Sequence, residues 1–130
     1  MNKKYRLAEL QLAIMQVLWE QQEASVGNVR DALESLRSLA YTTVGTMLAK
    51  MEAKGLVDHR SDGRVNVYRP VVKREQVRQS MMSDLTERLF QGDVSQVMCH
   101  LLDGKGVTQD DLAELKKLIR RKERELENGR

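Results

Sequence analysis

The chain has 130 residues, of which 41% are hydrophobic and 32% charged, with a formal net charge of +3. This composition is too apolar for a disordered chain, and the length allows one compact domain or one small domain with an appended oligomerisation segment. A single cysteine, Cys99, excludes an internal disulfide and a thiolate metal cluster within one chain. No apolar run approaches the ~18 residues of a membrane helix and the start lacks a signal-peptide core, so we expect a cytoplasmic protein with no membrane contact.

The first third of the chain predicts two short helices. The first is expected to run from Glu9 to Glu20, with Trp19 covering the edge of the core. Ser25 is expected to cap the second, because its hydroxyl can accept a hydrogen bond from a backbone N–H group of the first turn. The side chains expected to face the core are Leu10, Ala13, Ile14, Val17 and Leu18 in the first helix, and Val26, Val29, Leu33 and Leu36 in the second.

The segment "LAYTTVGTMLAKMEAKGLV", residues 39–57, predicts a third helix with two different faces. Val44, Met47, Leu48 and Met51 fall at i, i+3, i+4 and i+7, which is the spacing of a buried stripe, and Gly55 suits the left-handed position after the helix. The opposite face is small and nearly free of acid, unlike an ordinary surface helix. It consists of Thr42, Gly45, Thr46, Ala49, Lys50 and Ala53.

After Gly55 the hydrophobic period changes from that of a helix to that of strands. "LVDHR", "SDG" and "RVNVYRP" predict two short strands joined by a tight turn, closed by Pro70. Three helices followed by a β-hairpin is the order of a winged helix-turn-helix. We therefore expect a mainly α fold with a small β-hairpin wing, in which residues 1–72 form the winged-helix domain.

Residues 73–130 predict three more helices, over about Lys73–Phe90, about Val94–Leu102 and from Thr108 onwards, where "TQDD" resembles a capping box. About 58 residues with one aromatic bury too little surface to fold stably alone. We therefore expect this helical region to dimerise with a second copy. The side chains assigned to the interface are Val77, Met81, Leu85, Leu89, Phe90, Val97, Met98, Leu101, Leu112, Leu115 and Ile119.

The region from Leu36 to Pro70 carries six basic and three acidic residues, and so accounts for the whole net charge. In a helix that lies in the major groove, the small residues Gly45, Ala49 and Ala53 would allow close approach, and Thr hydroxyl and methyl groups could meet bases or phosphates. Arginines on the hairpin would reach the neighbouring backbone. The predicted DNA contacts are Tyr41, Thr42, Thr43, Thr46, Lys50, Arg60, Arg64 and Arg69.

The same residues also allow a purely structural interpretation. Thr42 and Thr43 would then cap the helix, Gly45 would permit close packing, and the arginines would be solvated hairpin charges. A winged-helix module that binds a protein partner, without specific DNA binding, is the alternative function.

The sequence offers no set of residues typical of an enzyme, a metal site or a cofactor site. Asp58, His59 and Ser61 are close in sequence, but neighbouring strand residues point to opposite faces and cannot form a relay. Cys99 and His100 diverge by ~100° on a helix and lack a third ligand. No glycine-rich phosphate loop follows a strand.

Two long segments, "LAELQLAIMQVLWEQQEASVGNVRDAL" and "LAYTTVGTMLAKMEAKGLVDHRSDGRVNVYRP", resemble the penicillinase-repressor family of BlaI/MecI type, which includes the CopY-type copper regulators. "LTERLFQGDVSQVM" and "TQDDLAELKKLI" are similar to the family's dimerisation half. The resemblance implies a homodimeric winged-helix repressor that binds double-stranded inverted-repeat operators, often with TACA/TGTA-like half-sites. It implies Tyr41, Thr42, Thr43 and Thr46 in the recognition helix and Arg64 in the wing.

Three positions depart from the family pattern. Ala8 replaces the usual Ser or Thr cap of the first helix, which weakens that cap by about 1 kcal/mol. Cys99-His100 stands where β-lactam-responsive members carry the Asn-Phe bond that a protease cuts, so the resemblance does not carry cleavage over to this site, and an inactivating protease or sensor stays unidentified. The tail "RRKERELENGR" has none of the paired cysteines of CopY-type members, which excludes copper sensing through such a site.

Overall fold

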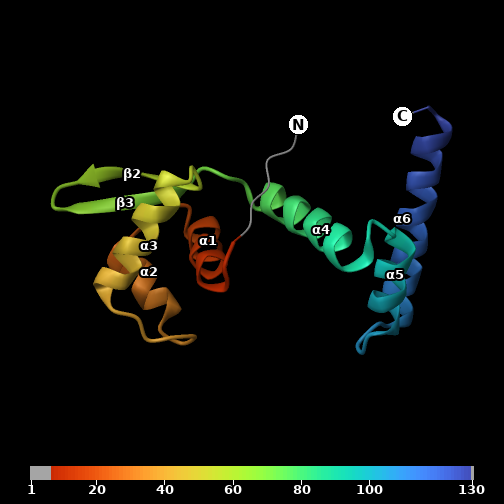
Figure 1. Cartoon of the computed structure of the whole chain (residues 1–130), viewed down its shortest axis with the longest axis horizontal. Coiled ribbons are helices and arrows are strands. Elements are labelled where there is room, and N and C mark those ends of the chain that lie inside the picture. Colours follow the sequence, from red (N-terminus) through yellow and green to blue (C-terminus); the bar gives the residue numbers. More distant parts are fainter. Residues whose placement is uncertain (1–6, 130) are drawn as a thin grey trace. The chain divides into compact units, whose positions relative to one another are not determined.

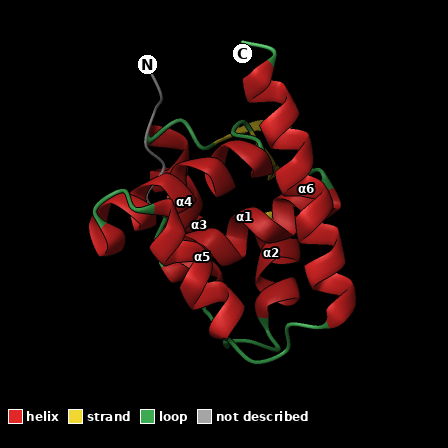
Figure 2. Cartoon of the chain, turned by 90° about the vertical axis from the view of Figure 1, so that its right-hand side faces the viewer, coloured by secondary structure: helices red, strands yellow, loops and turns green. Residues whose placement is uncertain are grey.

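The structure, a computed structural model, describes residues 7–129 (Figure 1). The elements run in the order α1 (Glu9–Gln21), β1 (Ala24–Ser25), α2 (Val26–Leu33), α3 (Tyr41–Ala53), β2 (Val57–Asp62), β3 (Val65–Pro70), α4 (Arg74–Phe90), α5 (Val94–Asp103) and α6 (Gln109–Glu127). Helices dominate the chain (Figure 2). The three strands form one small sheet. The mainly α fold with a β wing is confirmed.

The chain divides into two compact units, residues 1–85 and residues 86–130. The first unit includes most of α4 because Val77 is buried in the first unit's core and Met81 packs against that core. Val77 was assigned to the dimer surface, but its side chain is enclosed within its own subunit. The functional boundary between residues 72 and 73 stays a prediction.

The core of the first unit is built by the faces of α1, α2 and α3 that the sequence predicted. Ile14, Leu18, Val29 and Leu33 are all buried there. The Trp19 side chain lies half-buried against this core, and its Nε1–H group donates to the carbonyl of Val72 at 2.9 Å.

The helix α2 begins at a side-chain cap and ends earlier than the sequence predicted. The Ser25 hydroxyl accepts a hydrogen bond from the Asn28 N–H group at 3.1 Å, as predicted. The prediction that Leu36 faces the core was wrong, because α2 ends at Leu33 and the N–H groups of Leu36 and Arg37 turn back to the Leu33 carbonyl. Leu36 is consequently 76% exposed.

The wing is part of a three-stranded antiparallel sheet in the order β1-β3-β2. The strands β2 and β3 were predicted, whereas the two-residue strand β1 was not. It pairs Ala24 with Tyr68 and Ser25 with Val67. Tyr68 is the buried residue of β3, so the face that carries Val65 and Val67 is the outer one.

The recognition-type helix α3 ends in a Schellman motif. Gly55 has a φ of +80°, its N–H group donates to the Glu52 carbonyl at 2.9 Å, and the Leu56 N–H group donates to the Met51 carbonyl at 3.0 Å. This end confirms the predicted role of Gly55. It also turns the chain directly from α3 into β2, which joins the helix to the wing.

The second unit has strong helix caps and almost no core. Thr108 and Asp111 form the predicted capping box of α6, with hydrogen bonds of 3.1 and 3.0 Å, and Asp93 caps α5. Val97 is the one buried hydrophobic side chain among the described residues of this unit. Between residues 7 and 129, no helix has both the length and the apolar character needed to span a membrane.

Leu48→Ala should destabilise the first unit by about 2–5 kcal/mol, because Leu48 is fully buried and its truncation leaves a cavity. Urea unfolding followed by the fluorescence of Trp19, the only tryptophan, reports on this unit. Leu36→Ala, at an exposed leucine, is the matched control and should change the stability by less than about 0.5 kcal/mol. Equal effects of both substitutions would contradict the assigned core.

Candidate nucleic-acid interface

The outward face of α3 is exposed along its whole length. Tyr41, Thr42, Thr43, Thr46 and Lys50 are all exposed, as are Ala49 and Ala53. The opposite stripe is buried through Val44, Leu48 and Met51, with Met47 half-buried against the core. The predicted buried stripe is therefore confirmed, and the predicted outward face is confirmed except at Gly45, which is half-buried beside Val26. The DNA contacts themselves remain predictions.

Tyr41 is the first residue of α3, and its ring lies close to α2. Its side chain is 48% exposed, and the Arg30 guanidinium lies 5.8 Å from the ring centroid, a cation–π distance. Gly27 lies beside the ring, where a Cβ would make ordinary van der Waals contact with Tyr41 at 3.9 Å. The contact between Arg30 and Tyr41 joins two separate helices and was not predicted from the sequence. The Arg30 guanidinium is also paired with Asp31, with Nη2 3.3 Å from Oδ1.

Gly45 lies half-buried on the side of α3 that faces α2. A Cβ at this position would meet Val26 Cγ1 at 3.8 Å, which is ordinary van der Waals contact. The packing therefore does not require glycine. The structural interpretation of Gly45 as a residue needed for close packing is not supported.

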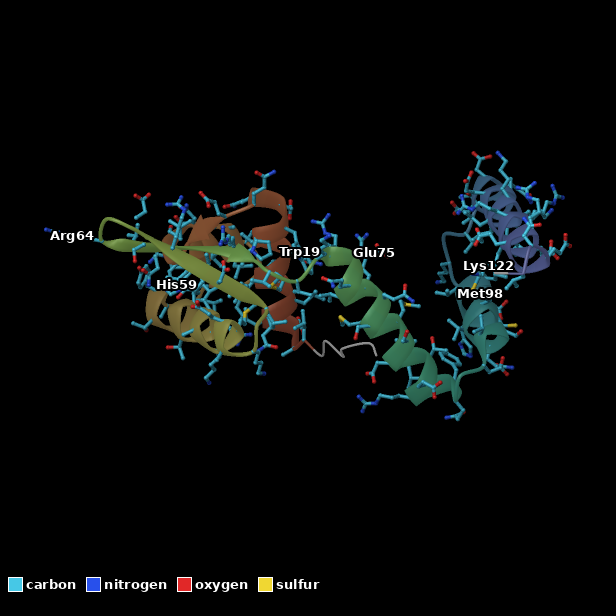
Figure 3. The ribbon with its side chains drawn as sticks, turned by 90° about the horizontal axis from the view of Figure 1, so that it is seen from above. Trp19, His59, Arg64, Glu75, Met98 and Lys122 are labelled. Carbon is cyan, nitrogen blue, oxygen red and sulfur yellow. The ribbon has the colours of Figure 1, made fainter. Side chains whose placement is uncertain are left out.

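The wing turns at Gly63 and Arg64, between the paired residues Asp62 and Val65. Gly63 supplies the positive φ, +66°, that this tight turn needs. Arg64 projects from the tip of the hairpin (Figure 3). Within residues 7–129, no ion pair or hydrogen bond occupies its guanidinium, and the same holds for the Lys50 ammonium.

The other two predicted wing cations are already paired with carboxylates. Arg60 Nη2 lies 2.7 Å from Glu23 Oε1, and Arg69 Nε lies 2.6 Å from Asp58 Oδ1. The hydrogen bond with Arg60 lowers the pKa of Glu23, and the same bond raises the pKa of Arg60. The local sequence does not distinguish Arg60 from Arg64, because the partner of Arg60, Glu23, lies 37 residues away along the chain.

Asp58, His59 and Ser61 each contact a different partner. His59 Nδ1 lies 2.7 Å from Glu52 Oε1, Asp58 accepts from Arg69, and Ser61 Oγ donates to Asn66 Oδ1 at 3.5 Å. Each of these three residues therefore has a partner outside the trio. Burial raises the pKa of Tyr68, whose ring centroid lies 5.2 Å from that of His59.

The model of the penicillinase repressor family matches residues 7–121 of the chain. The chain belongs to the penicillinase repressor family. It is 34% identical to the transcriptional regulator BlaI of Mycobacterium tuberculosis over 99% of this chain and 91% of that protein. It is 23% identical to the penicillinase repressor of Bacillus licheniformis over 92% and 93% of the two chains.

Comparison with solved structures places the helix-turn-helix and wing in the same family. The solution structure of the DNA-binding domain of the repressor BlaI has a TM-score of 0.51 and 28% identity, and the match covers 58% of this chain and 93% of that domain. This penicillinase-repressor family member is a DNA-binding transcriptional repressor and not an enzyme. The family match therefore favours DNA binding over the protein-interaction module that the sequence left open.

Gly45→Ala should stabilise the first unit by about 0.5–1 kcal/mol, because alanine loses less backbone entropy in a helix and its Cβ fits beside Val26. Thermal unfolding followed by Trp19 fluorescence measures the change. Gly55→Ala is the control of opposite sign, since its φ of +80° strains any residue with a side chain. A loss of stability in Gly45→Ala would show that the packing does need glycine.

Proposed function

We propose that this repressor acts as a homodimer on an inverted-repeat operator, with α3 of each subunit in the major groove and the wing tip on the neighbouring backbone. The observation that supports the proposal best is the outward face of α3. It presents Thr42, Thr43 and Thr46 next to small residues, and Lys50 at its end, with no carboxylate between Tyr41 and Met51. A surface of this kind allows close approach to a polyanion without charge repulsion.

Base and phosphate contacts are assigned to different parts of this surface. Thr46 lies in the middle of the exposed face, where a hydroxyl and a methyl group can meet base edges. Tyr41, Thr42 and Thr43 occupy the first turn, where free backbone N–H groups favour a phosphate. Lys50 and Arg64 have no carboxylate partner among the described residues and are cations that can neutralise phosphates.

Dimerisation is supported by the apolar surface that the second unit leaves open. Leu89 is 66% exposed and Ile119 is 57% exposed, and Leu101 and Leu118 are exposed as well. Phe90, Met98, Leu112 and Leu115 are only half-buried. Exposed apolar side chains in such numbers on 45 residues are typical of an interface.

The members of the proposed interface come from the helices of the second unit. Val77 and Met81 are left out because they pack on the core of the first unit, and Leu85, which is exposed, stands at the boundary of that unit. Two-fold symmetry of such a dimer places one half-site per subunit along the duplex.

Thr46→Ala should weaken binding by about 1 kcal/mol or more at particular base pairs, whereas Arg64→Ala should weaken binding to every sequence and reduce the salt slope by about 1. The operator is first recovered by selecting bound fragments from the source genome. Titrations on this duplex and on single-mismatch variants, at several salt concentrations, then separate the two effects. Uniform losses on all duplexes for Thr46→Ala would exclude a base contact.

Ile119→Ser should weaken the dimer about tenfold or more, because it removes an apolar side chain that each subunit would bury. Sedimentation velocity over a range of protein concentrations measures the dissociation constant. Lys117→Ser, at an exposed polar position of the same helix, is the matched control and should leave the dimer unchanged. A monomeric wild-type protein at micromolar concentration would contradict the proposed dimer.

A further inference from the structure

The wing strand β2 is held from both faces by carboxylates that belong to the helix-turn-helix. Neighbouring strand residues point to opposite faces, and His59 and Arg60 do so. His59 is bound by Glu52 on α3, at 2.7 Å. Arg60 is bound by Glu23, the residue directly before β1, also at 2.7 Å. The wing therefore makes two side-chain contacts with separate parts of the helix-turn-helix, in addition to the buried packing of Val57 and Tyr68.

The pair of Glu23 and Arg60 spans the whole width of the sheet. Because the strand order is β1-β3-β2, a bond from the start of β1 to a side chain of β2 passes over β3. Both carboxylate oxygens take part, since Arg60 Nε also donates to Glu23 Oε2 at 3.4 Å. Only two residue pairs join β1 to β3, and this ion pair adds a contact between the wing and the connection between α1 and α2.

The outer face of the sheet is poorly suited to a phosphate. Asp58, Arg60 and Asp62 alternate along β2 and share this face, and Asp58 is paired across the strands with Arg69. Arg60 Nη1 also lies 3.9 Å from Asp62 Oδ2. With Glu23, three carboxylates surround two guanidinium groups, so a phosphate arriving here meets net negative charge. Arg64 at the tip has no such neighbours.

We propose that Glu23 and Arg60 form a wing clasp, which positions the hairpin so that Arg64 reaches the DNA backbone. Arg60 and Arg69 are then positioning residues and not phosphate ligands. An exposed ion pair contributes little to global stability, so the effect of the clasp is on the placement of the wing. The inference rests on the proposed contact between Arg64 and DNA.

A charge swap in the full-length protein tests the clasp against direct phosphate binding by Arg60. The variants are Glu23→Gln, Arg60→Gln and the double variant Glu23→Arg with Arg60→Glu, and the probe is the duplex recovered by selection. Each single variant should weaken binding about two- to fivefold, the range that an exposed ion pair supports, with an unchanged salt slope. The swapped pair should restore binding to within about twofold of the wild type.

The opposite results would overturn the clasp. If Arg60 binds a phosphate, Glu23→Gln should strengthen binding to DNA, and Arg60→Gln should reduce the slope of log affinity against log salt concentration by about 1. The swap places a carboxylate at the phosphate and should then bind more weakly than Arg60→Gln. No change in any variant would equally reject the inference. Glu20→Gln removes the same charge from an exposed position three residues away and is the matched control.

A measurement without DNA separates failure of the clasp from failure of the proposed wing contact. Amide hydrogen exchange of the backbone groups that join β1 to β3 should become faster in both single variants and return to the wild-type rate in the swap. If Arg64→Ala leaves the salt slope unchanged while these exchange rates behave as expected, the contact of Arg64 with DNA is wrong and the clasp stands. Unchanged exchange in every variant would exclude the clasp itself.

Discussion

The burial of one stripe of α3 determines which face of this helix is exposed in the first unit. Val44, Leu48 and Met51 are fully buried, which fixes the rotation of the helix about its axis. Because the stripe and the opposite face are set by the same helical period, burial of the stripe leaves Thr42 and Thr46 exposed. The Schellman end at Gly55 then directs the chain into β2. The orientation of the exposed face of α3 and the path into the wing thus depend on the same helix.

Some cations of the wing are paired with carboxylates and others are not, and the net charge does not show this difference. The segment from Leu36 to Pro70 is basic as a whole, but its cations differ in availability. Arg60 and Arg69 are bound by carboxylates, while Lys50 and Arg64 have no partner among the described residues. Lys50 and Arg64 are the two of these free cations to which we assign phosphate contacts.

The second unit has well-defined helices but almost no buried core. Its caps are well formed, because Thr108, Asp111 and Asp93 satisfy the free N–H groups at the helix starts. Its apolar side chains are mostly exposed, and Val97 alone among its described hydrophobic residues is buried. Local interactions therefore define the helices, whereas a second copy is the partner that we propose for their apolar faces.

The sequence by itself determined the features that depend on near neighbours. Helical spacing placed α1, α3 and the later helices to within a residue or two, Ser25 and Thr108 marked helix starts, and the outward face of α3 was identified from the absence of acid. Composition and motif resemblance were enough to identify the family. These features need only information from within about one turn of helix or one hairpin.

Only the tertiary structure decided which distant residues meet. It added β1, placed Val77 in the core of its own subunit, exposed Leu36, and paired Arg60 with Glu23. None of these follows from periodicity, because each depends on a partner outside the local segment or on the residue at which a helix ends. The residues next to a charged or apolar side chain in the sequence do not reveal whether that side chain contacts a distant partner. Only the folded chain brings the partner to it.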